Sequence, residues 1–256
     1  MPPPVPATPQ RIAKVLARAG LCSRRDAERW IADGRVTLDG TVLTSPAITV
    51  TNASDIRVDG KPLPEADRAR LWRYHKPAGL VTTHRDERGR ATVFSALPKE
   101  LPRLISIGRL DLNSEGLLLL TNDGVLARRL ELPATGWVRR YKVRVHGEVD
   151  PARLAGLERG IKVDSVAYGP IRARLERQQG SNAWITLSLQ EGKNREVRRV
   201  LEHLGYPVTR LIRLAYGPFQ LGHLPRGAVE EVSRKALDEQ LGRGDETGWA
   251  HARRRR

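Results

Sequence analysis

The sequence has a single cysteine, Cys22, so the chain can form neither an internal disulfide nor a zinc site made of several cysteines. It has no apolar run that approaches the roughly 18 residues required to span a membrane. Residues 1–9 contain several prolines but lack the apolar stretch of a secretory signal. These absences lead us to expect a soluble, cytoplasmic protein.

The common patterns for metal and nucleotide binding are also missing from the sequence. Its six histidines show no metal-ligand spacing such as His-x-x-x-His. No Gly-x-x-x-x-Gly-Lys-Ser/Thr phosphate loop occurs. We therefore expect a protein that uses no metal and no nucleotide cofactor.

Acidic residues are too few to balance the basic ones. The chain has 29 Asp and Glu against 45 Lys and Arg, a formal net charge of +16, and lysine supplies only eight of the basic residues. The guanidinium group of arginine binds phosphate through two hydrogen bonds and stacks on bases. A membrane-surface protein would more naturally carry a basic amphipathic helix, which the sequence does not show. The composition therefore indicates a nucleic-acid partner.

Short-range patterns divide the chain into a small and a large folded region. Ile12, Val15, Leu16 and Ala19 have helical spacing, and Ser23 with Asp26 predicts a capping box that starts a second helix. Asp39-Gly40 is a hairpin-turn dipeptide. We predict five segments: a flexible arm at 1–9, a small domain at 10–58, a linker at 59–70, a large domain at 71–240 and a disordered basic tail at 241–256.

The large region mixes strand and helix patterns. Residues 141–145 and 184–189 alternate like strands, whereas residues 151–159 and 195–204 have helical patterns. Because no helix–strand unit repeats, a wound parallel sheet is not expected. The sequence predicts an α+β fold with a largely antiparallel sheet and flanking helices.

One polar loop stands out among buried strands. The stretch from Ile107 to Gly124 reads IGRLDLNSEGLLLLTNDG, in which an apolar strand ends at Gly108 and a fully buried strand covers residues 117–120. Asp111 in this loop would be fixed in position, and Arg109 could neutralise its charge. On these grounds alone a turn or capping role for Asp111 is the commoner outcome.

The small domain resembles a known RNA-binding motif. Residues 20–40 read GLCSRRDAERWIADGRVTLDG. They resemble the alpha-L motif of ribosomal small-subunit protein S-four and its relatives, with the Ser-Arg-Arg helix start and the Asp-Gly turn. The resemblance implies RNA binding by the two helices, with Arg24, Arg25 and Arg29 on phosphates and Lys14 and Arg18 in the same basic cluster. For Arg29, an ion pair with Asp26 is the alternative.

The large domain resembles the pseudouridine synthases. The G-R-L-D-x-x-S-x-G-L-L-L-L-T-N-D-G run matches their signature, in the branch that modifies ribosomal RNA and carries an N-terminal alpha-L domain. The resemblance implies that Asp111 is the nucleophile. It further implies that Tyr141 in R-Y-K-V stacks on the flipped base and that Arg198 in E-G-K-N-R-E-V-R-R-V pairs with Asp111. Leu211 is expected against the uracil, and Arg109 is expected to bind substrate.

The isomerisation itself explains why a single carboxylate could suffice. Uridine becomes pseudouridine by cleavage of the N1–C1′ bond and formation of a C5–C1′ bond, with no oxidation and no atom gained. A carboxylate can form a covalent adduct, at C6 of the base or C1′ of the sugar, that divides the reaction into easier steps. The target uridine must first leave its stack.

Three alternatives remain at this point. The H-K-P-x-G-L-V-T-T loop favours large-subunit (23S) over small-subunit (16S) ribosomal RNA as the substrate. A noncatalytic RNA-binding or ribosome-assembly factor would use the same charge without needing Asp111, Tyr141 and Arg198 together. An alpha-L methyltransferase would need a glycine-rich methyl-donor loop, which this sequence lacks. We expect the enzyme to act as a monomer.

Overall fold

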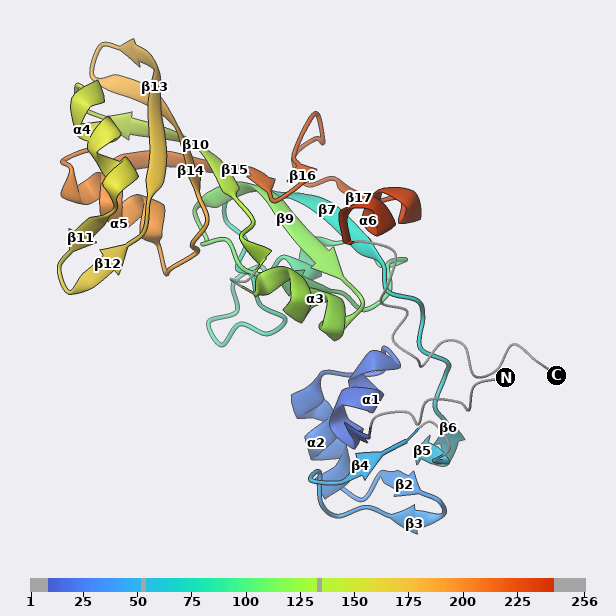
Figure 1. The fold of residues 1–256 in the computed structure, drawn as a ribbon. Helices are drawn as coiled ribbons and strands as arrows, with labels where there is room; N and C mark the ends of the chain where they lie inside the picture. The colour runs from blue at the N-terminus through green and yellow to red at the C-terminus, as the bar shows by residue number, and fades with distance from the viewer. Residues whose placement is uncertain (1–8, 52–53, 133–134, 242–256) are drawn as a thin grey trace, which may run out of the picture. The chain divides into compact units, whose positions relative to one another are not determined.

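The computed structural model describes residues 9–51, 54–132 and 135–241. The described chain forms two compact units (Figure 1). The small unit comprises the described residues up to Arg70 with 122–124 and the end of the chain from Lys235, and the large unit comprises Leu71–Thr121 and Val125–Arg234. The arm predicted at 1–9 and the tail predicted at 241–256 lie, except for Pro9 and Leu241, outside the described residues.

The small unit packs two helices against short strands. Its helices are α1 (Ile12–Arg18) and α2 (Arg24–Ala32). Four of its strands form a sheet in the order β3-β2-β5-β6, and two more pair as β1 with β4. These strands are β1 (Gln10–Arg11), β2 (Val36–Leu38), β3 (Thr41–Val42), β4 (Thr49–Val50), β5 (Ile56–Val58) and β6 (Lys61–Pro62).

Local sequence signals produce this small unit as expected. The Ser23 hydroxyl accepts a hydrogen bond from the Asp26 backbone N–H, and the Asp26 carboxylate accepts one from the Ser23 backbone N–H, which completes the capping box. Asp39 and Gly40 adopt φ angles of 49° and 83°, so they form the predicted tight turn between β2 and β3. The apolar faces of α1 and α2 meet the strands in a core that includes Ile12, Leu16 and Ile31.

The large unit is built on a mixed sheet, nine-stranded in the described part of the chain. Its strand order is β13-β14-β10-β15-β9-β7-β17, with β16 paired to β15 and β8 to β9. All of these pairs are antiparallel except β15 with β9. The strands are β7 (Leu71–Lys76), β8 (Ile105–Ile107), β9 (Ser114–Thr121), β10 (Arg139–His146), β13 (Ile171–Gln179), β14 (Asn182–Leu189), β15 (Val208–Tyr216), β16 (Phe219–Gln220) and β17 (Val229–Glu231).

Helices and a short hairpin complete the described elements. The α-helices beyond the small unit's first two are α3 (Gly124–Glu131), α4 (Pro151–Ala155), α5 (Glu196–His203) and α6 (Arg234–Leu241). The helix predicted at 151–159 changes to a 3₁₀ turn, η3 (Gly156–Arg159), and a second 3₁₀ turn is η1 (Phe94–Ala96). The hairpin consists of β11 (Ile161–Val163) and β12 (Val166–Tyr168). The structure thus confirms the predicted α+β fold with a largely antiparallel sheet.

Two hydrophobic clusters lie on one face of the large sheet. The first joins β10, β14 and β15 to α4 and α5 through residues such as Val143, Ile185 and Val200. The second packs Trp72 and Tyr74 of β7 and Leu118 of β9 against the segment that precedes β8, including Val93 and Leu104. The loop that carries Asp111 follows this segment. Leu110, the residue before Asp111, packs in the second cluster, which holds this loop against the covered face of the sheet.

None of the helices in the described part of the chain combines the length and hydrophobicity needed to cross a lipid bilayer.

Candidate active site

Asp111 lies in the loop between β8 and β9, at the start of a completely buried strand. Every residue of β9 is buried, which fixes the point where the loop ends. The Asp111 backbone carbonyl accepts a hydrogen bond from the Ser114 N–H at 3.0 Å, which closes a turn over the intervening residues. The Asp111 side chain is 36% exposed. Its carboxylate is therefore positioned by a rigid element and remains accessible to a bound molecule.

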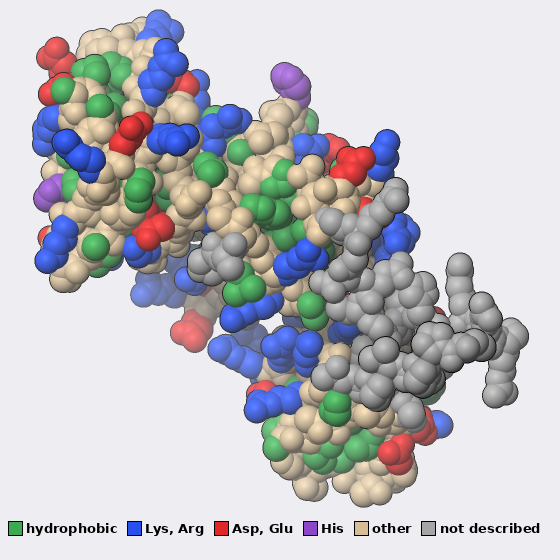
Figure 2. Space-filling view, viewed as in Figure 1, with side chains coloured by type: hydrophobic (Ala, Val, Ile, Leu, Met, Phe, Trp, Pro, Cys, Tyr) green, Lys and Arg blue, Asp and Glu red, His purple; other side chains and the backbone are tan. Residues whose placement is uncertain are grey.

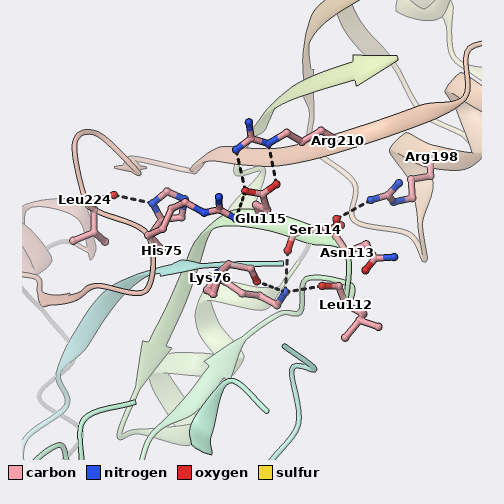
Figure 3. Close-up of polar contacts among 11 residues, drawn as sticks. His75, Lys76, Leu112, Asn113, Ser114, Glu115, Arg198, Arg210 and Leu224 are labelled. Carbon is pink, nitrogen blue, oxygen red and sulfur yellow. Dashed lines mark hydrogen bonds and ion pairs between the residues drawn. The ribbon is translucent and has the colours of Figure 1, made fainter. Parts of the chain in front are cut away.

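Lys76, the last residue of β7, holds this loop in place through hydrogen bonds to its backbone. Its side chain is completely buried, and its ammonium group donates hydrogen bonds to the backbone carbonyl oxygens of Asp111 (3.0 Å), Leu112 (3.3 Å) and Ser114 (2.9 Å), as well as to that of Pro77 (Figure 3). Burial lowers the pKa of Lys76 to about 8, against the opposing charges of Asp111 and Glu115. The buried ammonium thus ties the end of β7 to the backbone of Asp111 and of the residues that follow it.

The ion pair at Asp111 comes from Arg195. Its Nη1 atom lies 3.4 Å from Oδ2 of Asp111. Arg195 precedes α5 and has a left-handed backbone, with a φ of 51°. Neither of the two arginines expected to neutralise Asp111 forms this pair. Arg109 is exposed and has no ion pair with another described residue.

Arg198 lies nearby but binds the loop backbone. Its guanidinium donates to the carbonyl oxygens of Asn113 at 3.1 Å and Val208 at 3.3 Å (Figure 3). Burial lowers the pKa of Arg198, while the charge of Asp111 opposes that shift. Arg198 is one helical turn into α5 and is buried there, so it reaches the neighbouring peptide groups, whereas Arg195 at the exposed helix start reaches the carboxylate.

Tyr141 and Leu211 lie on adjacent strands and on the same side of the sheet. Val143 pairs with Leu211 and Tyr141 pairs with Arg213 across β10 and β15. Directly paired residues, and those two apart on one strand, share a face. Tyr141 and Leu211 both belong to the cluster that includes Val197 of α5, and they are 8% and 6% exposed. The parallel pairing of Leu211 with Ser114 connects this cluster to the loop of Asp111.

Glu196 is a second carboxylate at the start of α5. Its side chain is buried, and Oε2 accepts a hydrogen bond from the Lys193 N–H at 2.9 Å, while Oε1 has no hydrogen-bond partner in the described structure. Burial raises the pKa of Glu196, mainly because a charged carboxylate is poorly solvated there. Glu196 therefore stabilises the turn from Lys193 to Glu196, which contains Arg195 and leads into α5.

Sequence reasoning missed the contacts of Lys76 and a charged cluster on the opposite face of β9. Arg210 donates two hydrogen bonds to the buried carboxylate of Glu115, at 2.9 and 3.0 Å, and Arg226 lies 3.0 Å from the same group (Figure 3). These cations lower the pKa of Glu115, Arg210 through its hydrogen bonds first. A lysine at the end of an otherwise apolar strand pattern was a detectable signal, whereas the Glu115 cluster joins residues 95 positions apart.

The basic residues predicted to bind RNA cluster on the helices of the small unit. Arg24 and Arg25 in the first turn of α2 are exposed, and Lys14 and Arg18 on α1 are partly buried. Arg29 forms an ion pair with Asp26, the alternative weighed for it. Burial and the neighbouring charges of Arg24 and Arg18 lower the pKa of Lys14. Within the described part of the chain, the guanidinium groups of Arg24 and Arg25 at the start of α2 are exposed and form no ion pair.

Comparison with known proteins defines the class of this chain. The family model described as RNA pseudouridylate synthase matches residues 70–203, and the S4 domain model matches residues 10–57. The protein belongs to the RNA pseudouridylate synthase family, in a form with an N-terminal S4 domain. Both resemblances seen in the sequence are thereby confirmed, and so is the prediction that the protein is an enzyme.

Individual relatives match about nine-tenths of this chain. The chain is 47% identical over 231 residues to an RNA pseudouridine synthase of Rickettsia prowazekii, covering 90% of this chain and 97% of the relative. It is 43% identical over 239 residues to ribosomal large subunit pseudouridine synthase B of Yersinia pestis, covering 90% of this chain and 74% of the relative. A crystal structure of a pseudouridylate synthase matches with a TM-score of 0.63 and 25% identity, over 90% of this chain and 99% of that one.

Proposed function

We propose that this enzyme isomerises one uridine of large-subunit (23S) ribosomal RNA to pseudouridine, with Asp111 as the nucleophile. The observation that carries the proposal is the position of Asp111, whose accessible carboxylate stands on a loop fixed by Lys76 and beside the Arg195 cation. The similarity to synthases named for the ribosomal large subunit supports the choice of RNA. Exposed arginines on α2 of the S4 domain provide phosphate contacts.

The proposed reaction uses few groups. The target uridine leaves its stack and enters beside Asp111, with Tyr141 and Leu211 as the apolar contacts for its base. The Asp111 carboxylate forms a covalent adduct, at C6 or at C1′, as the N1–C1′ bond breaks. The uracil turns and C5 bonds to C1′, and the bond between Asp111 and the adduct carbon breaks, which regenerates the free carboxylate. The C5 proton leaves and N1 takes up a proton, so substrate and product are isomers. Arg195 orients the carboxylate, while Arg198 fixes the neighbouring backbone and Arg109 remains available to the RNA.

We further propose that the enzyme acts as a monomer in the compartment where ribosomal RNA is processed, the cytoplasm of a bacterial cell. The groups assigned to the reaction all come from one chain, and two of them, Asp111 and Tyr141, are connected through one sheet. No second copy is needed to complete the site. The isomerisation requires no external oxidant or co-substrate.

The test is a comparison of the wild-type enzyme with Asp111→Asn in cells that lack their own copy of this synthase. Pseudouridine is mapped across both ribosomal RNAs. We expect the wild type to restore one pseudouridine in the large-subunit RNA and Asp111→Asn to restore none, because an amide is a poor nucleophile. Asp164→Asn, in the exposed turn between β11 and β12, is the matched control and should behave like the wild type.

Two results would contradict the proposal. Equal activity of Asp111→Asn would remove the carboxylate from the chemistry. Restoration in small-subunit RNA alone would leave the reaction intact and show that the substrate is the 16S molecule.

A further inference from the structure

One face of the large sheet is rich in arginine and lies opposite the face that carries Tyr141. Strands β10, β14 and β13 place their side chains there in three rows, each row given by direct pairing. The rows are Arg140–Ser188–Arg172, Lys142–Thr186–Arg174 and Arg144–Trp184–Arg177. Directly paired residues project to the same side of a sheet. We call the five residues Arg140, Lys142, Arg144, Arg172 and Arg174 the basic sheet face.

The two sides of these strands have opposite characters. Val143, Ile185 and Leu187 point to the other side, where they pack with α4 and α5 in the main hydrophobic cluster. On the basic sheet face, the four arginines are exposed and Lys142 is half-buried. Figure 2 shows Lys and Arg side chains spread over the part of the molecule that carries β13 and β14. In an antiparallel sheet one face is commonly packed on the core and the other is exposed to solvent. Exposure to solvent requires polar residues, but it does not require that so many of them carry a positive charge.

Most of the positive charge on this face is unpaired. The side chains of Arg144, Arg172 and Arg174 form no hydrogen bond or ion pair with any residue that the structure describes. Glu176 of β13 is an acid close to them, and it binds Lys142 at 3.0 Å and the Thr186 hydroxyl, while the charge of Arg174 helps to lower its pKa. Like charges that lie close together on one face of a sheet repel each other unless something neutralises them, and along β10 and along β13 they follow two residues apart on the same face. The folded protein therefore carries an electrostatic cost here that an anionic partner would remove.

We propose that the basic sheet face is a second RNA-binding surface, which binds the backbone of a helix in the same RNA molecule, apart from the helix that carries the target uridine. This inference rests on the proposed action on ribosomal RNA, whose folded form brings several helices close to any one uridine. Three exposed guanidinium groups, one on β10 and two on β13 with β14 between these strands, can contact different phosphates of one RNA backbone, each through a two-pronged hydrogen bond. Double-stranded RNA is recognised mainly through its backbone and shape, which suits a flat surface of arginines.

An acidic protein is the other conceivable partner, and the structure favours RNA. A protein interface would be expected to bury apolar or aromatic anchors at its centre. Trp184 is the aromatic residue within the three rows, and the Lys142 ammonium already lies over its ring at 5.3 Å from the centroid. The centre of the face is thus polar and charged, as at a phosphate-binding surface.

The experiment measures RNA binding by the full-length enzyme with Arg144, Arg172 and Arg174 all changed to Gln. The probes are the complete large-subunit ribosomal RNA transcript and a short stem–loop that contains the uridine mapped in vivo. We expect the triple variant to bind the long RNA at least about tenfold more weakly, with the slope of log K against log salt reduced by about one for each lost contact. Binding and pseudouridine formation on the short stem–loop should remain as in the wild type.

The matched control removes three exposed basic residues from other elements of the same unit, through Arg128→Gln, Arg159→Gln and Lys162→Gln. The control should bind both RNAs with wild-type affinity. Unchanged binding of the long RNA by the Arg144, Arg172 and Arg174 variant, an equal loss in the control, or an equal loss on the short RNA would each overturn the inference. Failure of the proposed function is seen separately, because it is the wild type that would then form no pseudouridine in large-subunit RNA.

Discussion

At the scale of single residues, Lys76 is unusual because its charged side chain is completely buried. A completely buried ammonium loses its hydration, and it persists because four backbone carbonyl oxygens surround it. Three of those oxygens belong to the loop of Asp111 and the first residue of β9. The position of the Asp111 carboxylate is therefore set through the backbone, because Lys76 donates its hydrogen bonds to main-chain carbonyl oxygens of the loop.

Replacing Lys76 with Met should lower kcat strongly and change KM little. Met has a similar shape but donates no hydrogen bond, so the Asp111 loop loses its anchor. We expect kcat to fall at least about tenfold with little change in KM, because a small displacement of a reacting group greatly lowers the rate of the chemical step. Pseudouridine formation on the stem–loop substrate measures both. Lys99→Met, at an exposed position, is the control, and a Lys76→Met enzyme with full kcat would contradict this role.

The difference in stability between the wild type and Lys76→Met should depend on pH. The pKa of Lys76 is about 8 in the folded protein, against 10.5 for an ordinary lysine, so the unfolded chain binds more protons between these values. The cost of charging Lys76 is fully present below pH 8 and disappears as the pH approaches 10.5. The free energy of unfolding of the wild type minus that of Lys76→Met should thus rise by about 3 kcal/mol over this window. Urea denaturation at pH 7.5 and 10.5 measures it, and a constant difference would refute it.

At the scale of elements, the parallel contact between β9 and β15 determines the geometry of the site. It brings Leu211 opposite Ser114 and Arg213 opposite Gly116. Gly116 has a φ of 101°, and a Cβ atom there would lie 2.3 Å from the Arg213 carbonyl oxygen. The strands can approach this closely only because residue 116 has no side chain. The glycine in the G-R-L-D-x-x-S-x-G signature thus has a structural reason.

Gly116→Ala should destabilise the large unit severely. The added methyl group clashes with backbone rather than with a flexible side chain, so the two strands must separate. We expect a loss of more than about 3 kcal/mol in the free energy of unfolding. Gly108→Ala is a matched control, since Gly108 also has a positive φ, 67°, but has no atom within 4 Å of the added Cβ. The control should lose only about 1–2 kcal/mol, and equal losses in denaturant titrations would show that contact with β15 is not the cause.

At the scale of the whole molecule, the net charge of +16 is distributed among separate surfaces. One is the start of α2 in the S4 domain, with Arg24 and Arg25 exposed. Another is the basic sheet face of the large unit. The loop between β8 and β9, in contrast, contributes a single accessible carboxylate, Asp111, with a cation beside it. In the proposed function the positive surfaces bind the polyanion, and the negative group performs the chemistry.

Changing Arg24 and Arg25 together to Ala should weaken RNA binding without changing the chemical step. Each lost phosphate contact reduces the salt dependence, so the slope of log K against log salt should decrease by about two. Filter binding with the ribosomal RNA transcript at several salt concentrations measures this, and single-turnover rates at saturating enzyme should stay the same. Arg57→Ala with Lys61→Ala, on the strands of the same unit, is the control. A variant with an unchanged slope would remove α2 from the RNA interface.

Much of the local structure could be predicted because its causes are local. The capping box at Ser23, the Asp39-Gly40 turn and the alternating strands β10 and β14 all depend on residues close together in the sequence. The large sheet could be described as mainly antiparallel because no helix–strand unit repeats. Local patterns could not show whether Arg195 or Arg198 forms an ion pair with Asp111. In the structure Arg195, which has a left-handed backbone, is the arginine whose guanidinium reaches the carboxylate.

The sequence by itself determined the α+β fold through periodicity, and it determined the class of enzyme and the loop of the proposed nucleophile through motifs that resemble a family, because motifs and periodicity are both properties of neighbouring residues. Only the tertiary structure decided that Lys76 anchors that loop, that Arg195 faces Asp111 and that five basic side chains share one open face of the sheet. Each of these depends on strand order and register, which join residues far apart in the chain through long-range packing.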